Sequence, residues 1–233
     1  MISKIYLVVG VLVGAVAAVD KTVDPDKVAA LKLSATDLDR AQEQLATDED
    51  WLFDFNSQPL YTYSPGSVVN ANAATFPAMT GHGMTVAMLN LGPCAMLPPH
   101  YHPRATNMVV AIEGTTNTYM VQENGARTVA ETLTPGKMTI FPKGSLHTMQ
   151  NTGCGNATLV SSLNSEDTGT LNILNGLWSV PHDMILAAFG HGAAVNLTAY
   201  GQSIPPPGTG SVLGSAQCLE ACRKQEQYVQ EYP

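Results

Sequence analysis

Three histidines and one asparagine form the most chemically distinctive pattern in the sequence. His100 and His102 stand two positions apart, Asn107 follows shortly after them, and His147 lies much later in the chain. Imidazole nitrogens and a side-chain oxygen are donors that divalent transition metals accept in proteins. These four residues are therefore predicted to bind one metal ion.

For any single histidine, the alternative is a hydrogen-bonded residue on the protein surface. Three of the six histidines take part in the pattern, which favours the metal site. His82 lies between two glycines, where an exposed loop residue is the simpler interpretation. His182 and His191 follow the strand-rich region, and they are also predicted to be exposed.

Strands must position these side chains. Residues two apart on a strand project from the same face, so His100 and His102 would point together. The charged content of the chain is only 13%, while 20 glycines and 15 prolines supply turns. This composition indicates an all-β fold, a β-barrel or jelly roll that gathers distant side chains in its interior. The predicted strands include residues 84–91, 108–112, 118–122 and 137–141.

The chain divides into four predicted segments. Residues 1–18 contain a lysine, an apolar run and small residues in that order, as in a secretory signal peptide. The alternative is a membrane anchor, but the run is shorter than the roughly 20 residues of a spanning helix. Residues 20–50 are predicted as an N-terminal helical extension, 51–180 as the barrel and 181–233 as C-terminal helices. The net charge of −8 argues against nucleic acid or an anionic membrane as partner.

The cysteines suggest a disulfide framework. If His100 and His147 lie opposite each other on antiparallel strands, opposing residue numbers keep a nearly constant sum along the ladder. Cys94 and Cys154 match that sum to within one unit, so a Cys94–Cys154 disulfide is predicted. The other two cysteines are one helical turn apart, and their pairing stays open. The four cysteines are Cys94, Cys154, Cys218 and Cys222.

Two N-glycosylation sequons agree with a secreted, extracellular or cell-wall protein. They begin at Asn156 and Asn196, and each is followed by a threonine two positions later. An even number of cysteines suits the same oxidising environment.

Two segments carry a paired pattern of glycines, histidines and turn residues. The positions are Gly92, His100, His102 and Gly114 in the first motif, and Gly136, Pro142, Gly144, His147 and Asn151 in the second. These segments resemble the paired motifs of the cupin superfamily. The stretches at residues 68–77, 98–106 and 163–167 resemble germin-like proteins and the spherulin-like secreted cupins of fungi and slime moulds.

The resemblance covers roughly residues 50 to 200. It implies a single cupin jelly-roll barrel with N-terminal and C-terminal helical extensions, and one divalent metal ion per chain. In this family the ion is usually manganese, held by three histidines and a glutamate. The family also implies assembly into a homo-oligomer, a trimer or hexamer.

The sequence departs from the family at Asn107, which stands where the glutamate ligand is expected. An amide oxygen brings no negative charge, so we expect weaker manganese affinity and a higher Mn(III)/Mn(II) potential. Copper or zinc should therefore compete better with manganese for the site. The nearby Glu113 precedes a turn glycine, and it is predicted to be exposed rather than to replace the ligand.

A second departure concerns the substrate. Germin oxalate oxidases carry asparagines at places that hold Leu97 and, by our alignment, Thr80 in this chain. Arg104 belongs to the stretch that resembles the family, and it is predicted to form a structural salt bridge. These features make oxalate oxidase the less favoured activity.

Two functions are therefore compared. The first is a metal-dependent oxidoreductase that acts on a small oxygen species, as a superoxide dismutase does. The second is a non-catalytic structural or storage cupin of the cell wall or spore surface.

Overall fold

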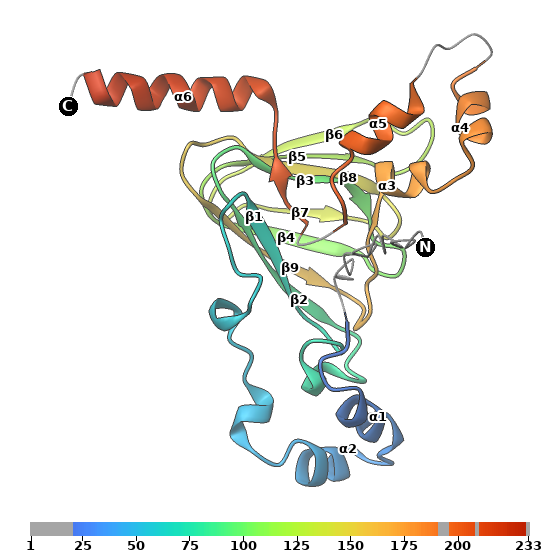
Figure 1. The fold of residues 1–233 in the computed structure, drawn as a ribbon. Coiled ribbons are helices and arrows are strands. Elements are labelled where there is room, and N and C mark those ends of the chain that lie inside the picture. The colour runs from blue at the N-terminus through green and yellow to red at the C-terminus, as the bar shows by residue number, and fades with distance from the viewer. Residues whose placement is uncertain (1–20, 191–195, 208–209, 232–233) are drawn as a thin grey trace, which may run out of the picture.

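The computed structural model describes residues 21–190, 196–207 and 210–231, so the proposed signal peptide and His191 lie outside the described residues. The strands form two antiparallel sheets (Figure 1). The first sheet has the order β1-β2-β9-β4-β7. Its strands are β1 (Gly66–Ala71), β2 (Thr85–Leu91), β9 (Ala157–Leu163), β4 (Asn107–Glu113) and β7 (Met138–Phe141).

The second sheet has the order β10-β3-β8-β5-β6, and the short strand β11 also pairs with β3. Most neighbouring strands of this sheet, such as β3 and β8 or β8 and β5, are distant in sequence, as in a jelly roll. This arrangement brings β3 and β8, which carry the two histidine motifs, side by side. The strands are β10 (Leu171–Asn172), β3 (Ala95–Tyr101), β8 (Leu146–Asn151), β5 (Thr116–Val121), β6 (Val129–Leu133) and β11 (Val212–Leu213).

The main hydrophobic core contains side chains from both sheets. Strand β9 shows the expected alternation, in which every second residue is buried from Ala157 to Leu163. Leu91, Val109 and Leu159 are completely buried. Such alternating apolar positions specify which face of each strand points inward. The all-β cupin jelly roll expected from the sequence is thus the observed fold.

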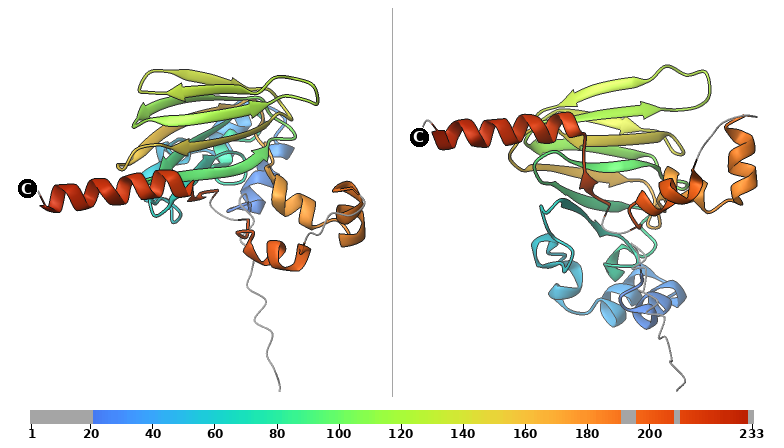
Figure 2. Two further views of the ribbon diagram at one scale, coloured as in Figure 1. Left: turned by 90° about the horizontal axis from the view of Figure 1, so that it is seen from above. Right: turned by 45° about the horizontal axis from the view of Figure 1, so that its top comes forward.

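The N-terminal helices pack beside one end of the sheets (Figures 1 and 2). They share a small core of their own, formed by Leu31, Leu45 and Ala78. Asp24 caps the first helix by accepting a hydrogen bond from the backbone N–H of Lys27 at 2.9 Å. The elements are α1 (Pro25–Leu33), α2 (Asp37–Asp39), the π-helical turn η1 (Arg40–Gln44) and the 3₁₀ turns η2 (Asp48–Trp51), η3 (Phe55–Ser57) and η4 (Pro77–Met79).

Four helices follow the last long strand, and no helix within the described ranges is long and apolar enough to cross a membrane. The final helix, α6, projects beyond the edge of the sheets in every view (Figure 2). Just before it, β11 pairs with Ala95 and Met96 of β3. The helices are α3 (Ile173–Trp178), α4 (His182–Ala188), α5 (Leu197–Ser203) and α6 (Ala216–Glu231).

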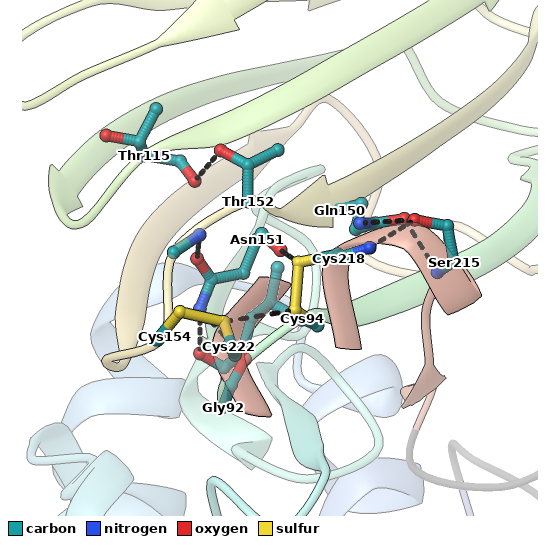
Figure 3. The surroundings of a disulfide bond; sticks show 12 residues. Gly92, Cys94, Thr115, Gln150, Asn151, Thr152, Cys154, Ser215, Cys218 and Cys222 are labelled. Atoms are coloured by element: carbon teal, nitrogen blue, oxygen red, sulfur yellow. Dashed lines mark hydrogen bonds between the residues drawn. A yellow bond between two sulfur atoms is a disulfide. The ribbon is translucent and has the colours of Figure 1, made fainter. Parts of the chain in front are cut away.

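The disulfide pairing differs from the prediction. Cys94 is bonded to Cys218, and Cys154 is bonded to Cys222 (Figure 3). The predicted Cys94–Cys154 disulfide is therefore wrong. The pairing left open for Cys218 and Cys222 is also resolved, because these two cysteines are not bonded to each other. All four cysteines are used, and both bonds attach α6 to the jelly roll.

Two physical reasons explain the difference. The β3–β8 register shifts by one residue between Leu97 and His100, so the relation that holds for the histidines does not extend to Cys94. The backbone N–H of Cys94 instead donates to the carbonyl of Gly153 at 3.2 Å. Residues four apart on a helix face the same side, so both cysteines of α6 point toward the jelly roll.

Candidate metal centre

The three predicted histidines converge on one point. His100 lies directly opposite His147 in the β3–β8 ladder, and His102 follows β3 immediately. One ring nitrogen from each histidine lies within 4.8 Å of the other two. Nitrogens that share one ion are at most about 4.2 Å apart, twice the metal–nitrogen distance. The three imidazoles are therefore placed to share a single ion after a small adjustment.

Backbone carbonyls set the orientation of each ring. The Nδ1 atoms of His100, His102 and His147 lie 2.7, 2.7 and 2.9 Å from the carbonyl oxygens of Pro98, Gly169 and Ser145, respectively. A carbonyl only accepts hydrogen bonds, so each Nδ1 carries the proton and each Nε2 of a neutral ring carries a lone pair. Such contacts commonly orient histidine ligands around metals.

Burial keeps two of the rings neutral. It lowers the pKa of His147 to about 2, with the neighbouring His100 as the next cause. Burial also lowers the pKa of His100 to about 4, followed by the effect of His102. Phe141 stacks on His147 with ring centroids 4.2 Å apart and planes inclined by 8°. Metal binding requires unprotonated imidazole, so these environments provide the correct state at neutral pH.

One buried atom tests whether a metal ion fits this site. Within the described part of the chain, the Nε2 atom of His147 has no hydrogen-bond partner. A buried polar atom without a partner costs about 1–3 kcal/mol. The lone pair belongs to the same cluster as the two other imidazoles. The donor set therefore fits a divalent transition metal, which would satisfy this atom.

Asn107 lies at the start of β4, is only 4% exposed and lines the same pocket as His100 and His102. Its Oδ1 accepts a hydrogen bond from the hydroxyl of Ser161 on β9. The amide oxygen can accept in two directions, so this bond leaves a second lone pair. Asn107 is thus the candidate for a neutral fourth ligand, and Ser161 orients it. Sequence reasoning missed Ser161, although its inward position follows from the alternation along β9.

The other motif residues have structural roles. A Cβ atom on Gly92 would lie 2.0 Å from the carbonyl oxygen of Tyr63, so only glycine fits there. The side-chain amide of Asn151 donates to the carbonyls of Leu91, Gly92 and Gly155 at 2.7–3.1 Å (Figure 3). These contacts hold the ends of β2 and β8 together, away from the histidines.

Two charged residues near the motif lie apart from the pocket. Arg104 forms the predicted salt bridge, since its guanidinium contacts the side chain and backbone carbonyl of Asp167. Glu113 is exposed at the end of β4, as expected. Neither residue lines the pocket next to the histidines.

His100 and His102 border a pocket between the sheets with a cavity volume of about 140 Å³. Leu97 lines it as expected. Thr80 does not line the pocket, because it is the C-cap residue of the η4 turn. The pocket residues from β2 are Ala87 and Leu89. Three pocket amides were missed by sequence reasoning because no local pattern marks them. They are Asn70, Asn172 and Asn175.

Both sequon asparagines are exposed. Asn156 lies in the loop between β8 and β9. Asn196 caps α5, and its Oδ1 accepts a hydrogen bond from the backbone N–H of Ala199 at 3.0 Å. Attachment of a glycan to the nitrogen of either side chain stays a prediction.

Comparisons with known proteins agree with this geometry. A family model described as cupin matches residues 54–196, more than half of the chain. Spherulin-1A of Physarum polycephalum is 29% identical over 202 residues, which cover 86% of this chain and 78% of the spherulin. Germin-like protein 1-1 of Oryza sativa subsp. japonica is 34% identical over 154 residues, which cover 61% of this chain and 68% of that protein.

Solved structures show the same fold. An oxalate oxidase superposes with a TM-score of 0.59 at 21% identity, covering 67% of this chain and 80% of the oxidase chain. An oxalate decarboxylase from Bacillus subtilis superposes with a TM-score of 0.60 at 14% identity. At such identities the likeness concerns the fold alone. The family match and the two homologues go further: the chain belongs to the cupin family, with spherulins and germin-like proteins as its relatives.

Proposed function

We propose that this cupin is a secreted metal-dependent oxidoreductase that acts on a small oxygen species, in the manner of a superoxide dismutase. The carrying observation is the cluster of three imidazoles whose ligand nitrogens lie within 4.8 Å of one another. The unpartnered Nε2 of His147 supports a bound ion, and the adjoining pocket offers space for a reactant.

Each residue has a distinct part in this proposal. His100, His102 and His147 would hold the ion through Nε2, and Asn107 would add its amide oxygen. The carbonyls of Pro98 and Ser145 keep the ring protons on Nδ1. When bound, manganese or copper would supply one-electron redox chemistry, whereas zinc has none.

The neutral Asn107 bears on the choice of metal. Manganese is implied by the family, but an amide compensates the charge of the ion less than a carboxylate does. Imidazole donors suit copper and zinc, and both bind a given site more tightly than manganese in the usual affinity order. We therefore expect one divalent ion per chain, with copper or zinc competing against manganese.

The second candidate is a structural or storage cupin of the cell wall or spore surface. The observation that favours it is the pair of disulfides that fasten α6 to both histidine-bearing strands, since Cys94 precedes β3 and Cys154 follows β8. Disulfides persist in oxidising compartments, which also supports secretion. Assembly into a trimer or hexamer belongs to the proposal by family resemblance. No nucleic acid or membrane partner is proposed.

Elemental analysis of protein from its native host, combined with a superoxide assay, separates the two candidates. The oxidoreductase should contain about one metal ion per chain, and His147→Ala should lose both metal and activity. The matched control is His82→Ala, because His82 is exposed and outside the cluster. Metal well below one per chain, or an His147→Ala variant with full activity, would contradict the proposal.

A further inference from the structure

The pocket next to the histidines has no charged lining. Among the described residues that border it, none is Asp, Glu, Lys or Arg. Arg104, the only cation in the first histidine motif, is held by Asp167 and does not border the pocket. Burying an anion without a partner of opposite charge is unfavourable. Without a bound cation, the protein side chains therefore favour an uncharged ligand.

The interior of the pocket is apolar. Five of its lining side chains are at most 4% exposed and come from both sheets, so their positions are set by the core. They leave a wall that can contact carbon atoms but cannot donate hydrogen bonds. The five residues are Ala87, Leu89, Leu97, Met149 and Leu163.

The mouth of the pocket is polar and neutral. Asn172 precedes α3 as its N-cap residue, yet its side chain makes no capping hydrogen bond and borders the pocket instead. Asn175 lies one turn later and donates to the carbonyl of Pro205 at 3.0 Å. Amides both donate and accept hydrogen bonds, so they suit hydroxyl and carbonyl groups.

The size of the pocket exceeds the need of an oxygen species. A water-sized molecule takes about 30 Å³, whereas the cavity volume of the pocket is about 140 Å³. Sites for organic ligands combine apolar walls with a few polar groups, as this pocket does. The pocket therefore has room for a small organic molecule in addition to an oxygen species.

We infer that the pocket binds an uncharged organic molecule with an apolar body and an oxygen donor. The donor would face His100, His102 and Asn107, the body would contact Leu89, Leu97 and Leu163, and hydroxyl or carbonyl groups would meet the amides of the mouth. The inference rests on the proposed metal centre only for the direction of the oxygen donor, because protein atoms alone form the pocket.

Binding of a homologous series of neutral ligands tests this inference. Acetamide, butanamide and hexanamide are titrated calorimetrically into metal-free and zinc-loaded protein, with oxalate for comparison. Burial of a methylene contributes about 0.8 kcal/mol, which is about fourfold in affinity. We expect affinity to rise about fourfold per methylene in both forms, and oxalate to bind the metal-free protein more weakly than hexanamide.

Variants locate the effect in the pocket. Leu97→Asn should reduce the gain per methylene to about twofold or less, while Leu213→Asn, on an exposed residue that does not line the pocket, should leave it unchanged. Leu171→Asn, at the more exposed mouth, provides the same test if Leu97→Asn fails to fold. Affinity independent of chain length, or tighter binding of oxalate to metal-free protein, would overturn the inference.

The outcome is independent of the proposed redox activity. Chain-length dependence in metal-free protein supports the pocket even if superoxide turnover is absent. Conversely, full superoxide activity with no chain-length dependence would retain the metal centre and refute the pocket.

Discussion

The attachment of α6 gives the sharpest stability prediction. The Cys94–Cys218 and Cys154–Cys222 bonds span 124 and 68 residues. In the chain-entropy description, cross-links of this span each stabilise the folded state by about 4–5 kcal/mol, and measured losses are about 2–5 kcal/mol. We expect removal of one bond by the double substitution Cys94→Ser with Cys218→Ser to cost at least about 2 kcal/mol.

Urea unfolding measures this loss. With a slope of about 2 kcal/mol per molar urea, a loss of about 2–5 kcal/mol lowers the midpoint by about 1–2.5 M. The slope should stay equal or rise, because removal of a cross-link lets the unfolded chain expand. The second bond still holds α6, so the variant should remain folded and contain no free thiol. Either of the two other possible pairings would leave Cys154 and Cys222 as free thiols in this variant. Thiol titration under denaturing conditions detects them.

A second double variant completes the test. Cys94→Ser with Cys154→Ser should remove both bonds and leave the two thiols of α6, with a larger loss of stability than in the first variant. A Cys218–Cys222 disulfide in this variant, or a stability equal to that of the wild type, would refute the reasoning about α6.

The other predictions concern the metal centre. Asn107→Glu should tighten manganese binding by about tenfold or more, because it restores a negative ligand; a competitive manganese–zinc titration showing unchanged preference would argue that Asn107 is not a ligand. Ser161→Ala should weaken metal binding by about 10-fold, the usual effect of losing a group that orients a ligand. The control Ser162→Ala, at a half-buried position outside the pocket, should leave metal binding unchanged. Equal effects in both variants would contradict the role of Ser161. Chelation of the purified protein should lower its melting temperature, since an ion at 100 times its dissociation constant stabilises by about 2.7 kcal/mol; a melting curve unaffected by chelator would speak against a bound ion.

Much of the fold could be predicted from sequence because its signals are local. The apolar runs at residues 84–91 and 108–112 and the turn residues between strands are short-range patterns, and they correctly indicated an all-β jelly roll. The same local logic placed His100 and His102 beside each other. Opposition of His100 and His147 followed from assuming that they share an ion, and the β3–β8 ladder has that pairing.

The disulfides show where such extrapolation ends. The register relation between two strands holds only while the ladder is regular, and the shift between Leu97 and His100 changes it by one residue. No signal in the sequence states that α6 returns to the ends of β3 and β8. The correct pairs could therefore not be selected from residue numbers.

The sequence by itself determined the histidine spacing, the family motifs and the neutral residue at position 107, because each is a matter of residue identity and local periodicity. Only the tertiary structure decided which side chains surround the histidines. Ser161 reaches Asn107, and Asn172 and Asn175 border the pocket, because strands and a helix from separate parts of the chain pack together there. Such contacts depend on long-range packing, which leaves no local pattern in the sequence.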